Sequence, residues 1–126
     1  MTVLDASAVL ALVHNEAGAD QVAQALPGSK LSTVNLAEVV GKLTDADIDA
    51  GQLKALLLAV GVTLEPFLPE DAELAGAMRA LPGGRALSLG DRCCLSLAVR
   101  SEPPEVLTSD RAWAELGLPI RVVLLR

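Results

Sequence analysis

The chain has 126 residues, of which 52% are hydrophobic and 2% aromatic, and its formal net charge is −6. These values fit one compact domain, residues 1–126, with a core of aliphatic side chains. They argue against wrapping of nucleic acid by bulk positive charge, and no apolar run approaches the roughly 18 residues that span a bilayer.

The N-terminus and the cysteines favour a cytoplasmic protein. Asp5 stands where an export signal would carry positive charge. Cys93 and Cys94 are adjacent in a predicted helix, so their side chains diverge and are poor partners for a disulfide. We therefore expect packed, reduced thiols.

Extended and helical segments alternate along the chain. The pattern predicts strands at residues 2–4, 30–32, 62–67, 105–108 and 121–125. It predicts helices at 7–14 with a loose continuation to 16, and at 19–26, 34–44, 49–60, 70–81, 88–100 and 111–116. This alternation implies a three-layer α/β/α fold around a central, mostly parallel sheet.

Four acidic residues lie where one predicted element gives way to the next. Asp5 and Asp110 follow strands, and Glu38 and Asp91 lie near helix starts. If the strands before Asp5 and Asp110 are parallel neighbours, both carboxylates emerge at the sheet edge where open α/β folds bind ligands. Clustered carboxylates repel one another, and a divalent cation relieves that repulsion. The arrangement predicts a metal site and, with it, phosphate chemistry.

Each of these residues also has a structural interpretation. Asp5 and Asp110 suit the N-cap position of the helices that follow. Asn35-x-x-Glu38 and Ser88-x-x-Asp91 resemble capping boxes. For any one residue the structural interpretation is the commoner one, whereas the four together favour a shared site.

Other side chains give no sign of a further functional site. His14, the one histidine, lacks the partners of a zinc site. Residues 81–85 lack the Lys-Ser/Thr ending of a phosphate-binding loop. Trp113 is expected to anchor the last short helix to the sheet.

Four segments, in order, resemble the PIN-domain ribonucleases, in particular the VapC toxins of bacterial type II toxin–antitoxin modules. They are Leu4–Leu10, Asn35–Val39, Leu87–Arg92 and Leu107–Trp113. The similarity spans the chain, although residues 41–82 are generic and two cysteines follow Asp91 where one is typical.

The resemblance implies a PIN-like fold and a Mg²⁺- or Mn²⁺-dependent endoribonuclease that cuts RNA, commonly tRNA or a ribosomal RNA loop. It implies a homodimer, and inhibition by a cognate VapB-like antitoxin whose C-terminal tail covers the active groove. It places the catalytic and metal-binding set at Asp5, Glu38, Asp91 and Asp110.

Phosphodiester hydrolysis by metal-activated water needs no histidine base. We expect Asp5 and Asp91 to be the principal ligands, Asp110 to complete the site directly or through water, and Glu38 to orient the nucleophile. Ser7 and Thr108 are expected to support the ligands or reach the scissile phosphate.

Arg92 and Arg111 each follow a predicted ligand. They are candidates for RNA phosphate contacts, or else solvated helix residues.

Two other functional classes remain open. One is a non-catalytic PIN-like module that binds RNA or protein. The other is a receiver or haloacid-dehalogenase-like phosphatase, but the latter needs a second Asp where Ser7 stands. A receiver needs a late Lys, and no Lys follows Lys54.

Overall fold

The computed structural model describes residues 2–125, so residues 1 and 126 of the expected domain lie outside it. Five strands form one sheet in the order β3-β2-β1-β4-β5, and every neighbouring pair is parallel. The prediction of a central parallel sheet is confirmed. The strands are β1 (Val3–Leu4), β2 (Lys30–Ser32), β3 (Thr63–Glu65), β4 (Glu105–Thr108) and β5 (Arg121–Leu124).

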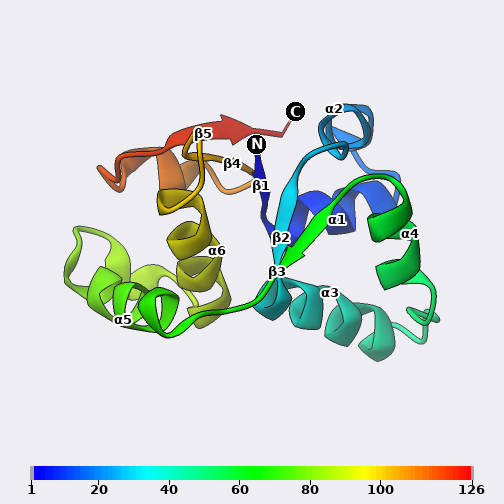
Figure 1. The fold of residues 1–126 in the computed structure, drawn as a ribbon, viewed down its shortest axis with the longest axis horizontal. Coiled ribbons are helices and arrows are strands. Elements are labelled where there is room, and N and C mark those ends of the chain that lie inside the picture. Colours follow the sequence, from blue (N-terminus) through cyan, green and yellow to red (C-terminus); the bar gives the residue numbers. More distant parts are fainter. Residues whose placement is uncertain (1, 126) are drawn as a thin grey trace.

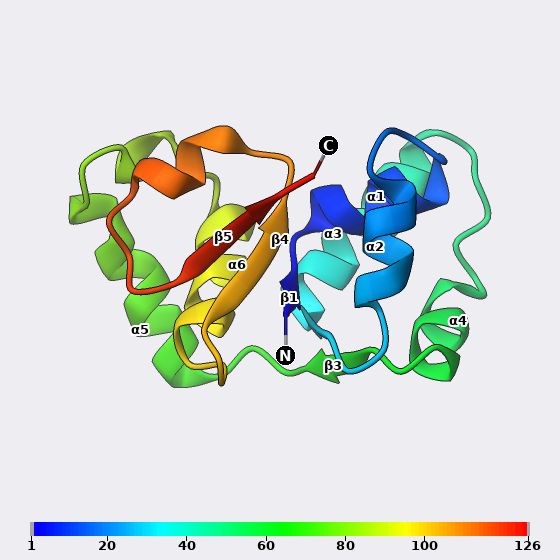
Figure 2. The same cartoon turned by 90° about the horizontal axis from the view of Figure 1, so that it is seen from above.

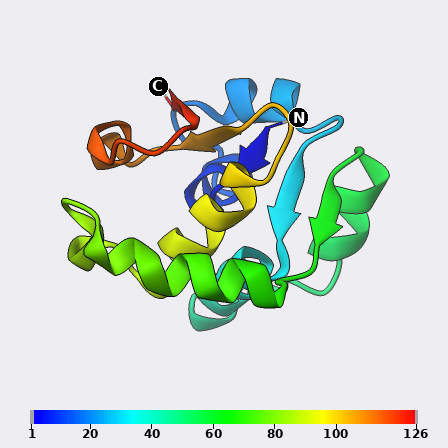
Figure 3. The same cartoon turned by 60° about the vertical axis from the view of Figure 1, so that its left-hand side comes forward.

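Helices cover both faces of the sheet, which confirms the three-layer α/β/α prediction. In Figure 1 one side holds α1 (Ala6–Val13), α2 (Ala19–Ala25), α3 (Thr33–Asp45) and α4 (Leu53–Ala59). The other side holds α5 (Pro69–Ala77) and α6 (Leu89–Val99), and α5 runs along the outside of this layer (Figure 3). Three short 3₁₀ helices complete the chain: η1 (Met78–Ala80), η2 (Gly84–Ala86) and η3 (Arg111–Glu115).

The sheet separates two apolar cores. Neighbouring residues on a strand face opposite sides, so Leu4 packs with α1 to α4, whereas Val3 packs with α6. Burial on both faces explains why these strands are apolar runs rather than alternating patterns. Trp113 of η3 is 1% exposed and belongs to the second core, as expected.

The strand order brings two chain reversals to the same edge. β1 pairs with β4 in parallel, with Val3 opposite Val106 and Leu4 opposite Leu107. The residues after Leu4 and after Thr108 therefore leave the sheet side by side at its carboxyl edge. Figure 2 shows β4 beside β1, with β5 outside it at the end of the sheet.

Several predicted boundaries are wrong by a few residues, for local reasons. The first helix ends at Val13, before Asn15 with φ 51°. α4 begins at Leu53 rather than at residue 49 or 50, because Asp49 Oδ1 accepts a hydrogen bond of 2.8 Å from Gly51 N and forms a turn. The helix predicted at 70–81 changes to 3₁₀ geometry after Ala77. Within residues 2–125, no helix has the length and apolar character needed to cross a membrane.

Candidate active site

Asp5 leaves the sheet directly after β1 and begins α1. Its Oδ1 accepts from Ala6 N at 2.9 Å, which confirms the predicted N-cap. Its Oδ2 accepts from Ser7 Oγ at 2.7 Å and from Thr108 Oγ1 at 2.9 Å, so the predicted support by Ser7 and Thr108 exists. The residue is only 6% exposed. Burial raises the pKa of the Asp5 carboxyl, and the charge of Asp91 raises it further, although the hydrogen bonds oppose the shift.

Asp91 lies in the first turn of α6. Asp91 N donates to Ser88 Oγ at 3.1 Å, and Asp91 Oδ2 accepts from Ser88 N at 3.0 Å, so the capping box predicted here is confirmed. Within the described residues no donor contacts Oδ1 of Asp91. The capping role therefore holds the side chain in place while leaving one carboxylate oxygen available.

Glu38 projects from α3 toward the start of α6. The capping box predicted for Asn35 and Glu38 is wrong, because the N-cap of α3 is Ser32, whose Oγ accepts from Val34 N at 3.2 Å. Asn35 instead lies inside the helix, and its Nδ2 donates to Glu38 Oε1 at 2.7 Å and to Gly90 O at 3.1 Å. This amide links α3 to α6.

These three carboxylates share one hollow of about 350 Å³. It lies between the start of α1, the middle of α3 and the start of α6, next to the carboxyl edge of the sheet. The residues that line it are Asp5, Ala6, Ser7, Leu10, Glu38, Lys42, Ser88 and Asp91. The buried thiol of Cys94 lies within reach of the same three charges. Burial raises its pKa well above the ordinary value, and Asp5, Asp91 and Glu38 all raise it further.

Asp110 occupies a different position from the other three acidic residues. It caps η3, because its Oδ1 accepts from Ala112 N at 3.0 Å. It is exposed and is absent from the lining of the hollow. Its connection to the site runs through Thr108, whose Oγ1 accepts from Asp110 N at 3.1 Å and donates to Asp5.

The donor chemistry of the hollow suits a hard divalent cation. Carboxylate oxygens are the ligands that Mg²⁺ and Mn²⁺ prefer. His14 is exposed at the C-cap of α1, and the Cys94 thiol faces Leu4 O at 3.7 Å. In this conformation, however, no three Asp, Glu, His or Cys side chains within residues 2–125 stand close enough to hold an ion together. The donor atoms fit the cation in kind. Mg²⁺ usually keeps several of its waters and takes one or two carboxylates directly, so the remaining carboxylates would act through water.

Arg92 is neither free to contact phosphate nor a solvated helix residue, so both sequence interpretations of it are wrong. It is only 9% exposed, and its Nη1 donates to Ala75 O at 2.9 Å, so it ties α6 to α5. Arg111 is exposed at the start of η3, and its phosphate contact stays a prediction.

Three residues of the site have roles that the sequence analysis does not predict. Lys42 is the one basic side chain among the lining residues, and its spacing of four from Glu38 on a helix was a usable signal. Asn35 and Gly90 act across 55 positions of sequence, so no local pattern could have revealed them.

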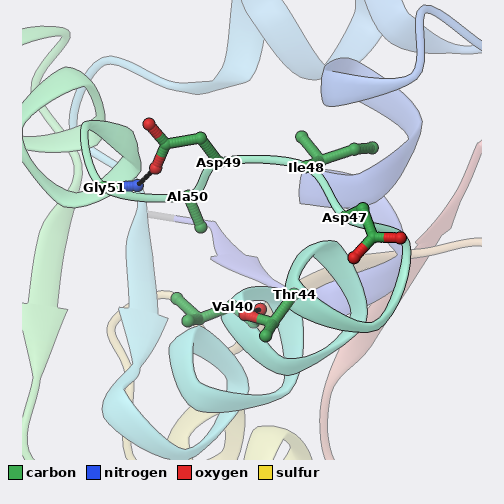
Figure 4. A pocket seen from close by; sticks show the side chains of 7 residues that line it. All are labelled: Val40, Thr44, Asp47, Ile48, Asp49, Ala50 and Gly51. Carbon is green, nitrogen blue, oxygen red and sulfur yellow. Dashed lines mark hydrogen bonds between the residues drawn. The ribbon is translucent and has the colours of Figure 1, made fainter.

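A second hollow, of about 500 Å³, follows the C-terminal end of α3. Figure 4 shows that its two carboxylates, Asp47 and Asp49, point in different directions. Asp49 Oδ1 accepts a hydrogen bond from Gly51 N, and the apolar side chains of Val40 and Ile48 also line the hollow. This hollow therefore offers no second convergent acidic site.

The architecture and the hollow define an α/β/α domain with an acidic cleft at the carboxyl edge of a parallel sheet. The family model described as PIN domain matches residues 2–118, a span that includes Asp5, Glu38, Asp91 and Asp110. The chain belongs to the PIN-domain family, and the predicted resemblance to that family is confirmed.

Solved structures share the fold over nearly the whole length. A toxin–antitoxin complex from Klebsiella pneumoniae matches with TM-score 0.70 and 20% identity, covering 98% of this chain and 96% of that one. VapBC2 from Rickettsia felis, bound to a DNA fragment from its promoter, matches with TM-score 0.70 and 13% identity, covering 99% of this chain and 98% of that one. FitAcB from Neisseria gonorrhoeae matches with TM-score 0.67 and 18% identity, covering 97% of this chain and 96% of that one. No curated protein sequence matches the chain.

Proposed function

We propose that the chain is a Mg²⁺- or Mn²⁺-dependent endoribonuclease, the toxin of a VapBC-like toxin–antitoxin module. The observation that carries the proposal is the gathering of Asp5, Glu38 and Asp91 around one hollow at the sheet edge. Membership of the PIN family supports the proposal and argues against the receiver and phosphatase interpretations. The solved neighbours, which are a toxin–antitoxin complex, VapBC2 and FitAcB, agree with this role.

The residues that would hold the cation are Asp5, Glu38 and Asp91, with Asp110 reaching the site directly or through water. A bound divalent cation would neutralise charge on the phosphate and acidify a coordinated water. Oε2 of Glu38 and Oδ1 of Asp91 accept no hydrogen bond from any described residue, so both remain available as donors of electron pairs.

The chain's own groups prepare the site for RNA. Ser7 and Thr108 keep the Asp5 carboxylate in one orientation, and the Ser88 cap does the same for Asp91. Glu38, which is partly exposed, would orient the attacking water and accept its proton. Lys42 supplies positive charge for a backbone phosphate at the rim.

We assign three partners to this function: structured RNA such as tRNA or ribosomal RNA as substrate, a VapB-like antitoxin, and a second copy of the chain in a homodimer. An antitoxin tail that enters the hollow would meet three carboxylates and one lysine, so a basic side chain on that tail complements it. The cytoplasm, where such RNA resides, is the proposed location.

The test is cleavage of end-labelled tRNA and ribosomal RNA fragments by the purified chain with Mg²⁺, with Mn²⁺ or with EDTA. We expect cuts with either cation and none with EDTA. Asp5→Asn is the matched control, and it should lower cleavage by more than about 100-fold while remaining folded. RNA binding without any cation-dependent cut would overturn the nuclease and identify a non-catalytic PIN module.

A further inference from the structure

The side chain of Asn35 joins the two helices that flank the acidic hollow. It is fully buried, with 0% exposure, in the first turn of α3. Both protons of its amide are used: one on Glu38 Oε1 at 2.7 Å, the other on Gly90 O at 3.1 Å. A spacing of three residues places Asn35 and Glu38 on the same face of the helix. The amide therefore fixes the Glu38 carboxylate relative to the backbone of α6.

Gly90 confines the same carboxylate from the other side. A Cβ built on Gly90 would lie 2.1 Å from Glu38 Oε2 and 2.5 Å from Oε1, distances that no real Cβ accepts. A side chain at position 90 would therefore displace the Glu38 carboxylate from its present place. Glu38 and Asp91, the residue after Gly90, line the same hollow.

The asparagine leaves one polar atom without a partner. Among the described residues, nothing donates to the buried Oδ1 of Asn35. A buried acceptor without a partner is unfavourable, and this cost offsets much of what the two hydrogen bonds of the amide contribute to stability. The net gain over an apolar side chain of similar size is therefore small, and what the asparagine adds is the orientation of Glu38.

We infer that Asn35 is a positioning residue for cation binding, acting through Glu38. Its amide holds Oε1, so the carboxylate keeps one orientation in the hollow that it shares with Asp91. This inference rests on the proposed function, because it assigns how the same site is held in shape. Without the amide, Glu38 regains rotational freedom and binds a cation only after losing it again. Removal of an orienting hydrogen bond of this kind lowers metal affinity by about 10- to 100-fold.

The experiment measures Mn²⁺ binding by calorimetry and stability in EDTA by urea unfolding, for the wild type and for Asn35→Leu. We expect Asn35→Leu to bind Mn²⁺ about 10- to 100-fold more weakly while its unfolding midpoint in EDTA stays close to the wild-type value. A purely structural role would give the reverse, with a lower midpoint and unchanged affinity, and would overturn the inference. If Asn35→Leu does not fold, Asn35→Ser removes the amide without adding volume and takes the same test.

A double-mutant cycle with Glu38→Gln shows whether Asn35 acts through Glu38. Once Glu38 is replaced, Asn35→Leu should cause no further loss of Mn²⁺ affinity, and an additional loss of the same size would overturn the inference. Failure of the proposed function is distinguishable, because a wild-type chain that neither binds Mn²⁺ nor cuts RNA removes both proposals. A wild type that binds normally, with Asn35→Leu binding equally well, removes only the positioning role.

Discussion

At the scale of single residues, Asp5 combines two opposing influences. Three donors, from Ala6, Ser7 and Thr108, stabilise its ionised form. Burial and the neighbouring charge of Asp91 outweigh them, so the pKa of the carboxyl is raised above its ordinary 3.8. An ionised Asp5 is therefore less favourable in the folded chain than in water, and a bound cation would stabilise it.

The raised pKa gives a pH-dependent prediction for Asp5→Asn in EDTA. Between 3.8 and the folded pKa, the native state binds more protons than the unfolded state, so the Asp5 contribution to stability falls as pH rises through that window. Asparagine cannot ionise, and its amide can donate to Ser7 and Thr108. We expect Asp5→Asn to be more stable than the wild type at pH 7, with the difference shrinking toward pH 4.

Urea unfolding of both proteins at several pH values in EDTA measures this difference. An Asp5→Asn protein that is less stable at pH 7, or a difference that does not change with pH, would contradict the raised pKa.

The site was only partly predictable from single residues. Asp5 and Asp91 could be named because one follows a strand and the other begins a helix, and the carboxyl edge of a parallel sheet brings such positions together. Glu38 could be named because it lies near the predicted start of a helix, although in the structure it stands in the second turn of α3. The role of Asn35 as the partner of Glu38 could not be predicted. A spacing of three residues occurs both in a capping box and in a pair that bridges to another helix. Only the tertiary packing of α6 on α3 decides between them.

At the scale of elements, strand and helix types followed reliably from apolar runs, whereas their ends depended on side-chain contacts. β4 spans the predicted residues, because Pro104 and the reversal after Thr108 bound it. α4 begins late because the Asp49 carboxylate bonds to Gly51 N and so competes with the helix. The free-energy difference between such a turn and one more helical turn is small. A periodic pattern of apolar residues therefore does not predict where the helix begins.

Asp71 connects α5 to the C-terminal end of α6. Its Oδ2 accepts from Leu68 N at 3.0 Å and so caps α5. Arg100, at the end of α6, donates to both of its oxygens at 2.8 and 3.0 Å. Asp71 is 3% exposed. Burial acts to raise its pKa, but the bonds from Arg100 and Leu68 together with the arginine charge overcome this, and the pKa is lowered below 3.8.

We therefore predict that Asp71→Asn lowers the free energy of unfolding at pH 7 by about 2 kcal/mol, the size of a charge-assisted hydrogen bond. A depressed folded pKa contributes stability that is complete above 3.8 and is lost as pH falls through the folded value. The gap between wild type and variant should therefore narrow as pH falls below 3.8. Urea unfolding from pH 7 to pH 3 measures it.

Glu70→Gln is the matched control, because Glu70 is an exposed neighbour in the same first turn. It should change stability by less than about 0.5 kcal/mol. Equal losses for the two variants would show that helix-end charge, rather than the pair with Arg100, carries the effect.

At the scale of the whole molecule, net charge −6 opposes the approach of RNA. The RNA binding proposed above would then depend on a few local positive charges. Lys42 is the basic residue that lines the acidic hollow, whereas Lys54 lies on α4 and lines none of the hollows described. A positive charge at that rim would contact phosphate without reading sequence.

Lys42→Ala should therefore weaken RNA binding more than Lys54→Ala, both made in the Asp5→Asn background so that RNA is bound but not cut. Loss of one phosphate contact releases one fewer counterion, so the slope of log affinity against log salt should become shallower by roughly 0.7 to 1. The affinity itself should fall by about fivefold at low salt, as expected for one exposed charge pair. Lys54→Ala should leave both values unchanged. Fluorescence anisotropy of labelled tRNA over a salt series measures them, and equal effects of the two variants would mean that RNA senses only the overall charge rather than the rim of the hollow.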